Sequence, residues 1–197
     1  MRPAYVLALC ALALMVGYEQ CASAQASSND PTQQRSDDRP EIIAVNANEL
    51  PLFPYDAGMV RFIASGESTS GAQAVVEVTE MPGYKTAWHQ HNNCEEVFYV
   101  LEGVLTIKLV DKTYTLPAGS YVFIPRGTPH GQGNFTKNPV RLLTTFTPGG
   151  FDQFFRDRVE LFKTTKPGDS AFQEKFDELR ARHGKWVQIL GSWDIDR

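Results

Sequence analysis

The sequence has few cysteines, no surplus of basic residues and no long hydrophobic run. Only Cys10, Cys21 and Cys94 occur among 197 residues, which excludes a scaffold held together by several disulfides. Lysine and arginine total 19 against 23 aspartate and glutamate, a net charge of −4, and without a basic surplus we expect no nucleic-acid partner. The apolar run over residues 4–16 is shorter than the ~20 residues of a membrane-spanning helix.

The amino-terminal residues have the pattern of a secretory signal. Arg2 supplies a positive charge, the apolar run follows it, and Ala22-Ser23-Ala24 has the form of a cleavage site. We expect a signal peptide over residues 1–24, cleavage after Ala24, and a secreted or periplasmic protein with no membrane contact afterwards. Cys94 would then be the one remaining cysteine. Residues 25–40 lack large apolar side chains and predict a flexible leader.

Short apolar segments separated by turn residues dominate the sequence from residue 41 onward. Twelve prolines and 15 glycines interrupt it too often for a long helical bundle or a coiled coil. This spacing predicts a mainly β, antiparallel barrel over residues 41–148. Residues 121–124 are apolar on both faces, so we expect a cover outside the barrel there. The expected strands are residues 41–45, 60–64, 74–79, 86–91, 97–101, 104–110, 113–116, 120–124 and 140–146.

Helical patterns replace the strand patterns after Thr147-Pro148-Gly149-Gly150. Apolar side chains recur at helical intervals over residues 151–162 and predict one helix. Ser170 and Gln173 fit a capping box at the start of a second helix, which Gly184 ends. We therefore expect a two-helix C-terminal tail over residues 149–197, which covers a barrel face or contacts a second subunit. A homodimer is the expected assembly.

Three of the four histidines lie close enough in the sequence to be candidate metal ligands. His89 and His91 are two residues apart on one expected strand, so both side chains leave the same face. Glu96 begins the next strand, and His130 follows a later turn. Inward residues of neighbouring strands converge in a barrel, and three imidazoles with one carboxylate suit a divalent transition metal. The alternative is four polar residues on a half-exposed sheet.

The spacing around these residues resembles the two sequence motifs of the cupin superfamily. The first is Gly83-x5-His89-x-His91-x4-Glu96-x6-Gly103, and the second is Gly119-x5-Pro125-x-Gly127-x2-His130-x3-Asn134. The resemblance implies a jelly-roll β-barrel in which His89, His91, Glu96 and His130 hold a divalent transition metal: Fe, Mn, Ni, Co or Zn. About residues 57–190 are similar to single-domain cupins of the quercetin 2,3-dioxygenase-like group.

That group implies a metal-dependent dioxygenase acting on an aromatic or enol-like (flavonol-type) small molecule, with O2 as the candidate second substrate. Glu96 is then the expected catalytic residue, a base that accepts the substrate's hydroxyl proton, although a structural ligand role for it is an equal alternative. Glu95 ranks second because strand alternation points it to the other face. A non-catalytic ligand-binding cupin and another cupin enzyme, such as an oxalate oxidase, are the competing functions.

Several other residues have simpler expected roles. Cys94 is interpreted as an inert turn residue, with an extra metal ligand or a redox-sensitive thiol as its alternatives. His183 is expected to meet backbone carbonyls at a helix end. Asn134 begins a glycosylation sequon, which we discount because Asn134 also completes the second motif. Four residues that follow Glu96 are expected to face inward, as core or as the lining of an apolar pocket: Phe98, Val100, Leu105 and Ile107.

Overall fold

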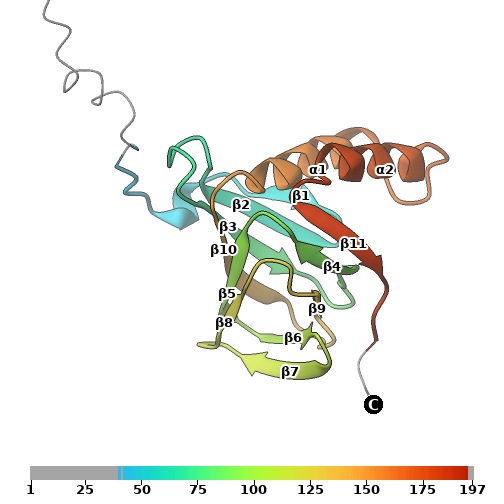
Figure 1. The fold of residues 1–197 in the computed structure, drawn as a ribbon, viewed down its shortest axis with the longest axis horizontal. Coiled ribbons are helices and arrows are strands. Elements are labelled where there is room, and N and C mark those ends of the chain that lie inside the picture. Colours follow the sequence, from blue (N-terminus) through green and yellow to red (C-terminus); the bar gives the residue numbers. More distant parts are fainter. Residues whose placement is uncertain (1–39, 41, 195–197) are drawn as a thin grey trace, which may run out of the picture. The chain divides into compact units, whose positions relative to one another are not determined.

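A computed structural model gives the fold of Pro40 and residues 42–194 (Figure 1). The expected signal peptide, and all of the expected leader except Pro40, lie outside the described residues. Within the described part of the chain, neither helix combines the length and the apolar character needed to cross a membrane.

Two antiparallel sheets make up the fold and confirm the mainly β jelly roll (Figure 1). One sheet has the strand order β1-β2-β3-β10-β5-β8, and the other has the order β11-β4-β9-β6-β7. The strands are β1 (Phe53–Tyr55), β2 (Gly58–Ala64), β3 (Ala74–Glu80), β4 (Trp88–His91), β5 (Glu95–Glu102), β6 (Val104–Leu109), β7 (Lys112–Pro117), β8 (Tyr121–Ile124), β9 (His130–Gly133), β10 (Val140–Thr147) and β11 (Val187–Gly191).

All the expected strands but one are present, with shifted ends. The strand expected over residues 41–45 is wrong: residues 42–45 have no regular structure, and Ile42 is 97% exposed. Its two isoleucines fit a pleated surface, but that preference acts only where neighbouring strands offer something to pack against. A short 3-10 helix, η2 (Ala47–Glu49), follows instead. The strands β1, β9 and β11 are additional to those expected.

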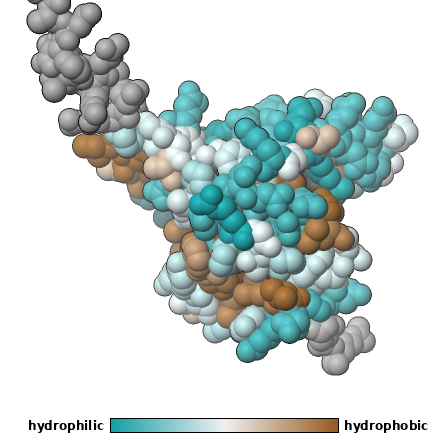
Figure 2. Space-filling model, viewed as in Figure 1, coloured by the Kyte–Doolittle hydropathy of each residue, from teal (hydrophilic) through white to brown (hydrophobic). Residues whose placement is uncertain are grey.

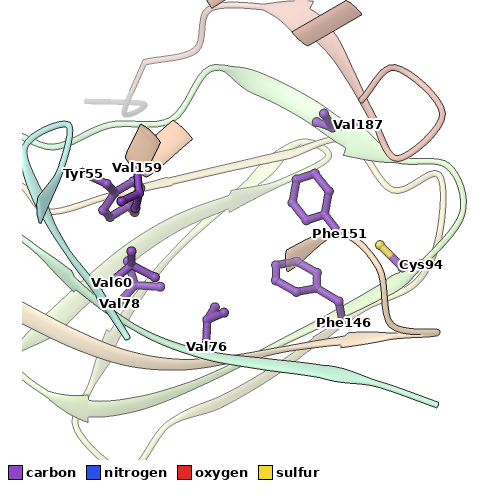
Figure 3. Packing of buried hydrophobic residues seen from close by; sticks show 9 residues of the cluster. All are labelled: Tyr55, Val60, Val76, Val78, Cys94, Phe146, Phe151, Val159 and Val187. Carbon is purple, nitrogen blue, oxygen red and sulfur yellow. The ribbon is translucent and has the colours of Figure 1, made fainter. Parts of the chain in front are cut away.

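Side-chain alternation puts the core between the two sheets. Phe98, Val100, Leu105 and Ile107 are all buried, which confirms their expected inward direction. A second group of buried side chains lies nearer the helices, and Figure 3 shows Phe146 and Phe151 side by side in it, 4.9 Å apart between ring centroids. The Cys94 thiol lies in the same cluster. The core therefore extends from the barrel interior to the start of the helical tail.

The two C-terminal helices are α1 (Asp152–Thr164) and α2 (Phe172–Arg182), and α1 packs against β1 and β3. The expected capping box is wrong: Ala171 is the N-cap of α2 without a side-chain hydrogen bond, and Gln173 Nε2 instead donates to Asp177. A backbone turn starts this helix instead, with the Phe172 N–H donating to the Asp169 carbonyl at 3.0 Å, so the Ser170 side chain is not needed. The tail then returns as β11, which pairs with β4.

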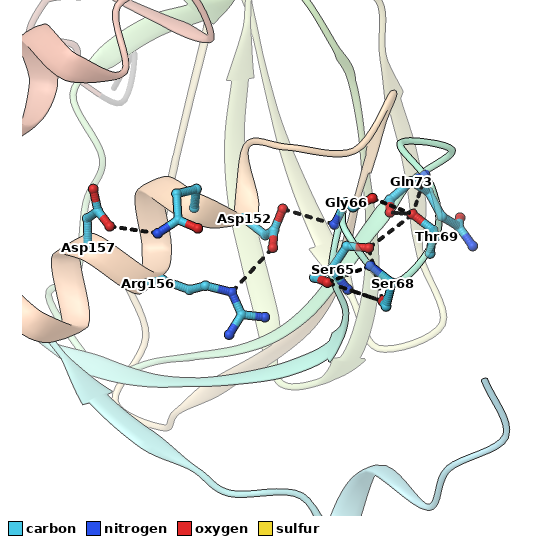
Figure 4. Close-up of polar contacts among 9 residues, drawn as sticks. Ser65, Gly66, Ser68, Thr69, Gln73, Asp152, Arg156 and Asp157 are labelled. Atoms are coloured by element: carbon cyan, nitrogen blue, oxygen red, sulfur yellow. Dashed lines mark hydrogen bonds and ion pairs between the residues drawn. The ribbon is translucent and has the colours of Figure 1, made fainter. Parts of the chain in front are cut away.

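A network of short polar contacts fixes the start of α1 (Figure 4). Asp152 accepts a hydrogen bond from the Gly66 N–H at 3.2 Å and forms an ion pair with Arg156 at 3.4 Å. A Cβ atom at Gly66 would lie 2.6 Å from the Gly150 nitrogen, so only glycine permits this approach of the two loops. The contact holds the helical tail against the barrel.

Nothing in the described chain covers the outer face of β8. Tyr121 is 63% exposed and Phe123 is 52% exposed, although their apolar character predicts a cover. Figure 2 shows apolar residues, in brown, gathered low in the view where β5 to β8 lie. The helices lie against the other end of this sheet, at β1 and β3, so they are not the cover of β8.

Candidate metal centre

The four side chains expected to hold a metal meet inside the fold. One ligand atom from each of His89, His91, Glu96 and His130 lies within 4.8 Å of the others. Glu96 Oε2 is 3.2 Å from His91 Nε2 and 3.0 Å from His130 Nε2. All four residues are buried, so they are not polar residues of a half-exposed sheet.

Strand pairing brings the four residues together. His89 and His91 share the inner face of β4, and His89 lies opposite His130 of β9. Glu96 enters from β5 in the other sheet. The turn before β9 requires a left-handed residue at Gly127, with φ +70°, whose N–H donates to the His91 carbonyl at 2.8 Å. The second motif is thereby tied to the strand that carries the first.

Backbone carbonyls orient all three imidazole rings. The Nδ1 atom lies 2.8 Å from the Ala87 carbonyl in His89, 3.2 Å from the Trp186 carbonyl in His91 and 2.8 Å from the Thr128 carbonyl in His130. A carbonyl only accepts, so each Nδ1 carries the proton in these contacts. The Nε2 lone pairs are then left for the centre, as in metal-binding histidines.

The electrostatics of the cluster call for a cation. With Nδ1 protonated, neutral His91 and His130 direct Nε2 lone pairs at the Glu96 carboxylate, and acceptors facing acceptors are stable only with a proton or a metal ion between them. Burial alone would raise the pKa of Glu96, but a positive charge and N–H donors at His91 and His130 would outweigh it and hold that pKa well below its usual range. Glu96 is therefore stable as a carboxylate here only when positive charge is present in the cluster. Burial, and then the neighbouring His130 and His91, lower the pKa of His89, which favours its neutral, ligating form.

The spacing of the cluster also fits a metal. Ligand atoms that share one ion with bonds of about 2.1 Å lie roughly 3–4 Å apart, and the four atoms here are within 4.8 Å of one another. Two or three neutral imidazoles with a carboxylate are a common ligand set for a divalent transition metal. The buried cluster can therefore hold such an ion, and the ligand set leaves its identity open.

A cavity of about 350 Å³ leads from the cluster to the helical tail. This volume is within the usual range for small-molecule sites. His89, His91 and Glu96 line one part of it, and phenylalanines from both helices line another. Of the four residues expected to face inward after Glu96, Phe98 alone reaches the cavity. The other three belong to the core.

The remaining candidate residues lie apart from the cluster. Glu95 points away from it and pairs with Arg126 at 2.6 Å. Cys94 is fully buried, and burial raises the pKa of its thiol to about 12, so it has the character of an inert residue and is not in the ligand cluster. The expectation for His183 is wrong: Nε2 lies 2.9 Å from the Asp157 carboxylate. Asn134 is buried and donates to the Glu80 and Asn138 carbonyls.

Several polar residues that line the cavity were not identified from sequence patterns, among them Tyr55, Glu80, Tyr84 and Arg158. Glu80 ends β3, and Arg158 lies on the apolar face of α1, where a charged side chain interrupts a row of phenylalanines. That interruption was the one available sign, because an arginine on a buried helix face needs a partner.

Comparison with known proteins places this site in a family. A family model described as a cupin domain matches residues 76–146, a range that includes His89, His91, Glu96 and His130. An uncharacterized protein of Methanocaldococcus jannaschii is 34% identical over 103 residues, which cover 50% of this chain and 79% of that protein. The chain belongs to the cupin superfamily.

Two further comparisons describe the relatives of this cupin. It is 28% identical over 96 residues to the quercetin 2,3-dioxygenase of Bacillus subtilis, covering 49% of this chain but only 28% of that protein. The solved structure of KdgF from a Halomonas species matches with a TM-score of 0.51 at 19% identity, over 57% of this cupin and 98% of that chain. The second match shows the shared fold alone.

Proposed function

We propose that this cupin is a metal-dependent dioxygenase that acts on a flavonol-type, aromatic or enol-like small molecule. The observation that supports this most is the placement of His89, His91 and Glu96 on the wall of a cavity that phenylalanine rings also line. Such a cavity favours a flat apolar ligand that presents a polar group to the cluster. The similarity to a quercetin 2,3-dioxygenase agrees with this function.

His89, His91, His130 and Glu96 would hold the ion in this proposal. A divalent metal bound there supplies a Lewis acid that makes a substrate hydroxyl or enol more acidic. Backbone carbonyls keep the three rings in place through their Nδ1 atoms. The chain therefore provides a ligand set whose orientation does not depend on the substrate.

Glu96 is the proposed proton acceptor. Its Oε2 contacts His91 and His130. Because Glu96 also lines the cavity, a substrate hydroxyl can reach its carboxylate. The phenylalanine walls exclude water, which strengthens the interaction between a substrate oxyanion and the centre.

The test is O2 uptake by the purified protein loaded with Fe(II), Mn(II), Ni(II) or Co(II), over a panel of flavonols and diketones. We expect uptake with at least one metal and one substrate, near-stoichiometric metal by elemental analysis, and substantial loss of both metal and uptake in His91→Ala. Glu96→Gln should lower the turnover rate by roughly 100-fold or more if Glu96 is the base.

Glu95→Gln is the matched control, because Glu95 is the adjacent residue and pairs with Arg126 outside the cluster. It should retain both metal and turnover. Absence of O2 uptake above that of metal-free protein, with every metal and substrate, would remove the dioxygenase. Stabilisation by a panel compound that is recovered unchanged would instead favour a ligand-binding cupin, and turnover of oxalate would favour an oxalate oxidase.

We also propose that the protein is exported, with the signal over residues 1–24. Support comes from Arg2, the apolar run and Ala22-Ser23-Ala24. Expression of the full chain followed by amino-terminal sequencing of the extracytoplasmic fraction should give a mature protein that begins at Gln25. Retention of Met1 in a cytoplasmic fraction would contradict this proposal.

A further inference from the structure

The cavity has a second polar end, built by the helical tail. Arg158 of α1 and Arg180 of α2 both line it. They lie on the tail rather than on the strands that carry the candidate metal ligands, and nothing in the proposed dioxygenase chemistry uses them. Each guanidinium forms one ion pair, Arg158 with Asp56 and Arg180 with Asp177. Because a guanidinium carries five N–H donors, each of them keeps donors that its aspartate does not occupy.

Aromatic rings surround the Arg158 guanidinium. Its guanidinium carbon is 5.1 Å from the Tyr55 ring centroid and 5.3 Å from the Phe176 ring centroid. Its ion-pair partner is the carboxylate of Asp56, bound through Nη2, and Tyr84 is a side-chain hydrogen-bond partner. Its Nε has no hydrogen-bond partner among the described residues. A guanidinium offers five N–H donors, so this arginine has donors to spare for a second anion.

Arg180 brings a second positive charge to the same place. Both guanidinium carbons lie close to the Phe176 ring centroid, that of Arg180 at 4.3 Å and that of Arg158 at 5.3 Å. Burial lowers the pKa of Arg180, its ion pair with Asp177 opposes this, and the charge of Arg158 lowers the pKa further. The two groups repel each other, and an anion near both would relieve this repulsion.

Aromatic rings connect this end of the cavity to the candidate metal centre. The His91 ring centroid is 4.5 Å from that of Phe151, and Phe151 stacks on Phe154 with centroids 5.2 Å apart. Phe154 in turn lies 6.0 Å from the Arg158 guanidinium carbon. Two phenyl rings therefore separate the two polar ends, so a ligand that touches both needs more than one ring.

We propose that Arg158 and Arg180 form an anion-binding subsite, and that the ligand of this cavity is a multi-ring aromatic compound carrying a carboxylate. The carboxylate binds at the helical end, the rings lie against the phenylalanines, and the opposite edge of the ligand faces the histidine cluster. This inference rests on the proposed function only in that both use one cavity, since anion binding requires no turnover.

A purely structural arginine is the competing explanation. In that case Arg158 would serve to tie α1 to the β1–β2 turn through Asp56. The two roles make opposite predictions for Asp56→Asn, which removes the competing charge but keeps an oxygen that can accept a hydrogen bond. The subsite predicts tighter carboxylate binding in this variant, because Arg158 loses its internal anion. A structural clamp predicts lower stability and no gain in affinity.

The test is calorimetric titration of the full protein with 2-naphthoate and with its neutral isostere 2-naphthamide. We expect 2-naphthoate to bind at least tenfold more tightly than the amide. Arg158→Met should remove that preference, Arg180→Met should reduce it, and Asp56→Asn should tighten 2-naphthoate binding several-fold. The matched control is Arg156→Met, which removes another arginine of α1 that stacks on a ring, Phe62 at 4.1 Å, and pairs with an aspartate outside the cavity lining.

Three results would contradict the anion-binding subsite. They are equal binding of the acid and the amide, no binding of either, and equal effects of Arg158→Met and Arg156→Met. A carboxylate bound at the candidate metal centre would show as affinity that Arg158→Met and Asp56→Asn leave unchanged. If Arg158→Met does not fold, Asp56→Asn and Arg180→Met decide. His91→Ala separates the two proposals, because it should remove O2 uptake and keep naphthoate binding that depends on Arg158.

Discussion

Glu80 is a buried carboxyl whose neighbours are an amide and another carboxylate. Gln132 Nε2 donates to its Oε1 at 3.4 Å, and its Oε2 has no partner among the described residues. Burial raises the pKa of Glu80 to about 8, against the small opposing effect of Gln132, and the charge of Glu96 raises it as well. The native protein therefore keeps this group protonated at neutral pH.

This residue makes stability depend on pH. In the unfolded chain Glu80 has the ordinary glutamate pKa of 4.5, and in the folded chain its pKa is about 8. Between these values folding takes up a proton, so the free energy of unfolding falls as pH rises, by up to ~1.4 kcal/mol per unit. We expect Glu80→Gln to remove this decline and to be more stable than the wild type at pH 8.5.

Urea unfolding at pH 5 and pH 8.5 measures the effect. Glu102→Gln is the control, because Glu102 is an exposed glutamate whose ion pair with Arg141 is at the surface. The idea fails if Glu80→Gln and Glu102→Gln lose stability in parallel with the wild type over this range.

At the level of single residues, the sequence identified the cluster but not the cavity around it. Two-residue spacing on a strand was enough to place His89 and His91 on one face. Glu80 gave no such sign, because a glutamate at the end of a strand normally points to solvent. Its burial depends on Gln132 and on neighbours that come from distant parts of the chain.

Among the elements, β11 and the residues around it support the strand that carries His89 and His91, a role that the sequence does not indicate. β11 pairs with β4, so Val187 lies opposite His91 and Ile189 lies opposite His89. The Trp186 carbonyl just before β11 accepts from His91 Nδ1. Helical periodicity in residues 151–182 does not show that the chain returns to the ligand strand, because a short strand with mostly exposed residues has no pattern of its own.

Trp193, after β11, closes over β9 where that strand has a glycine. A Cβ atom at Gly131 would lie 2.3 Å from Trp193 Nε1, which donates to the Thr86 carbonyl at 2.9 Å. We expect Gly131→Ala to displace Trp193, break this hydrogen bond and lower stability by ~1–3 kcal/mol. Thermal unfolding and tryptophan fluorescence measure the change, with a red shift as Trp193 meets water.

The control is Gly184→Ala, where the nearest atom, the Ala181 carbonyl oxygen, would lie 3.4 Å away. This substitution should change neither the unfolding temperature nor the fluorescence by much. An unshifted spectrum in Gly131→Ala would mean that Trp193 is not packed on β9.

At the scale of the whole molecule, the uncovered face of β8 is the unexplained part of the surface. Its apolar residues predicted a cover, yet the helices close the cavity end of the barrel instead. Exposed and buried residues alternate in β8: Val122 and Ile124 face the core, and the outer residues Tyr121 and Phe123 are equally apolar. The sequence therefore could not show whether the helices or something else packs on the outer face. Periodicity reports which residues are apolar but not what packs on them.

A second copy of the chain is the cover we predict. β8 is the last strand of its sheet, so its edge can pair with another strand. Tyr121 lies opposite Tyr99 of β5 and Phe123 lies opposite Val97, which makes a continuous apolar face for a two-fold contact. We expect a homodimer by analytical ultracentrifugation, and a folded monomer for the double variant Tyr121→Ser and Phe123→Ser.

Leu190→Ser is the matched control at the edge strand of the other sheet, where Leu190 is similarly exposed. Dissociation by Leu190→Ser alone would place the interface at β11, and a wild-type monomer would leave β8 as an uncovered edge.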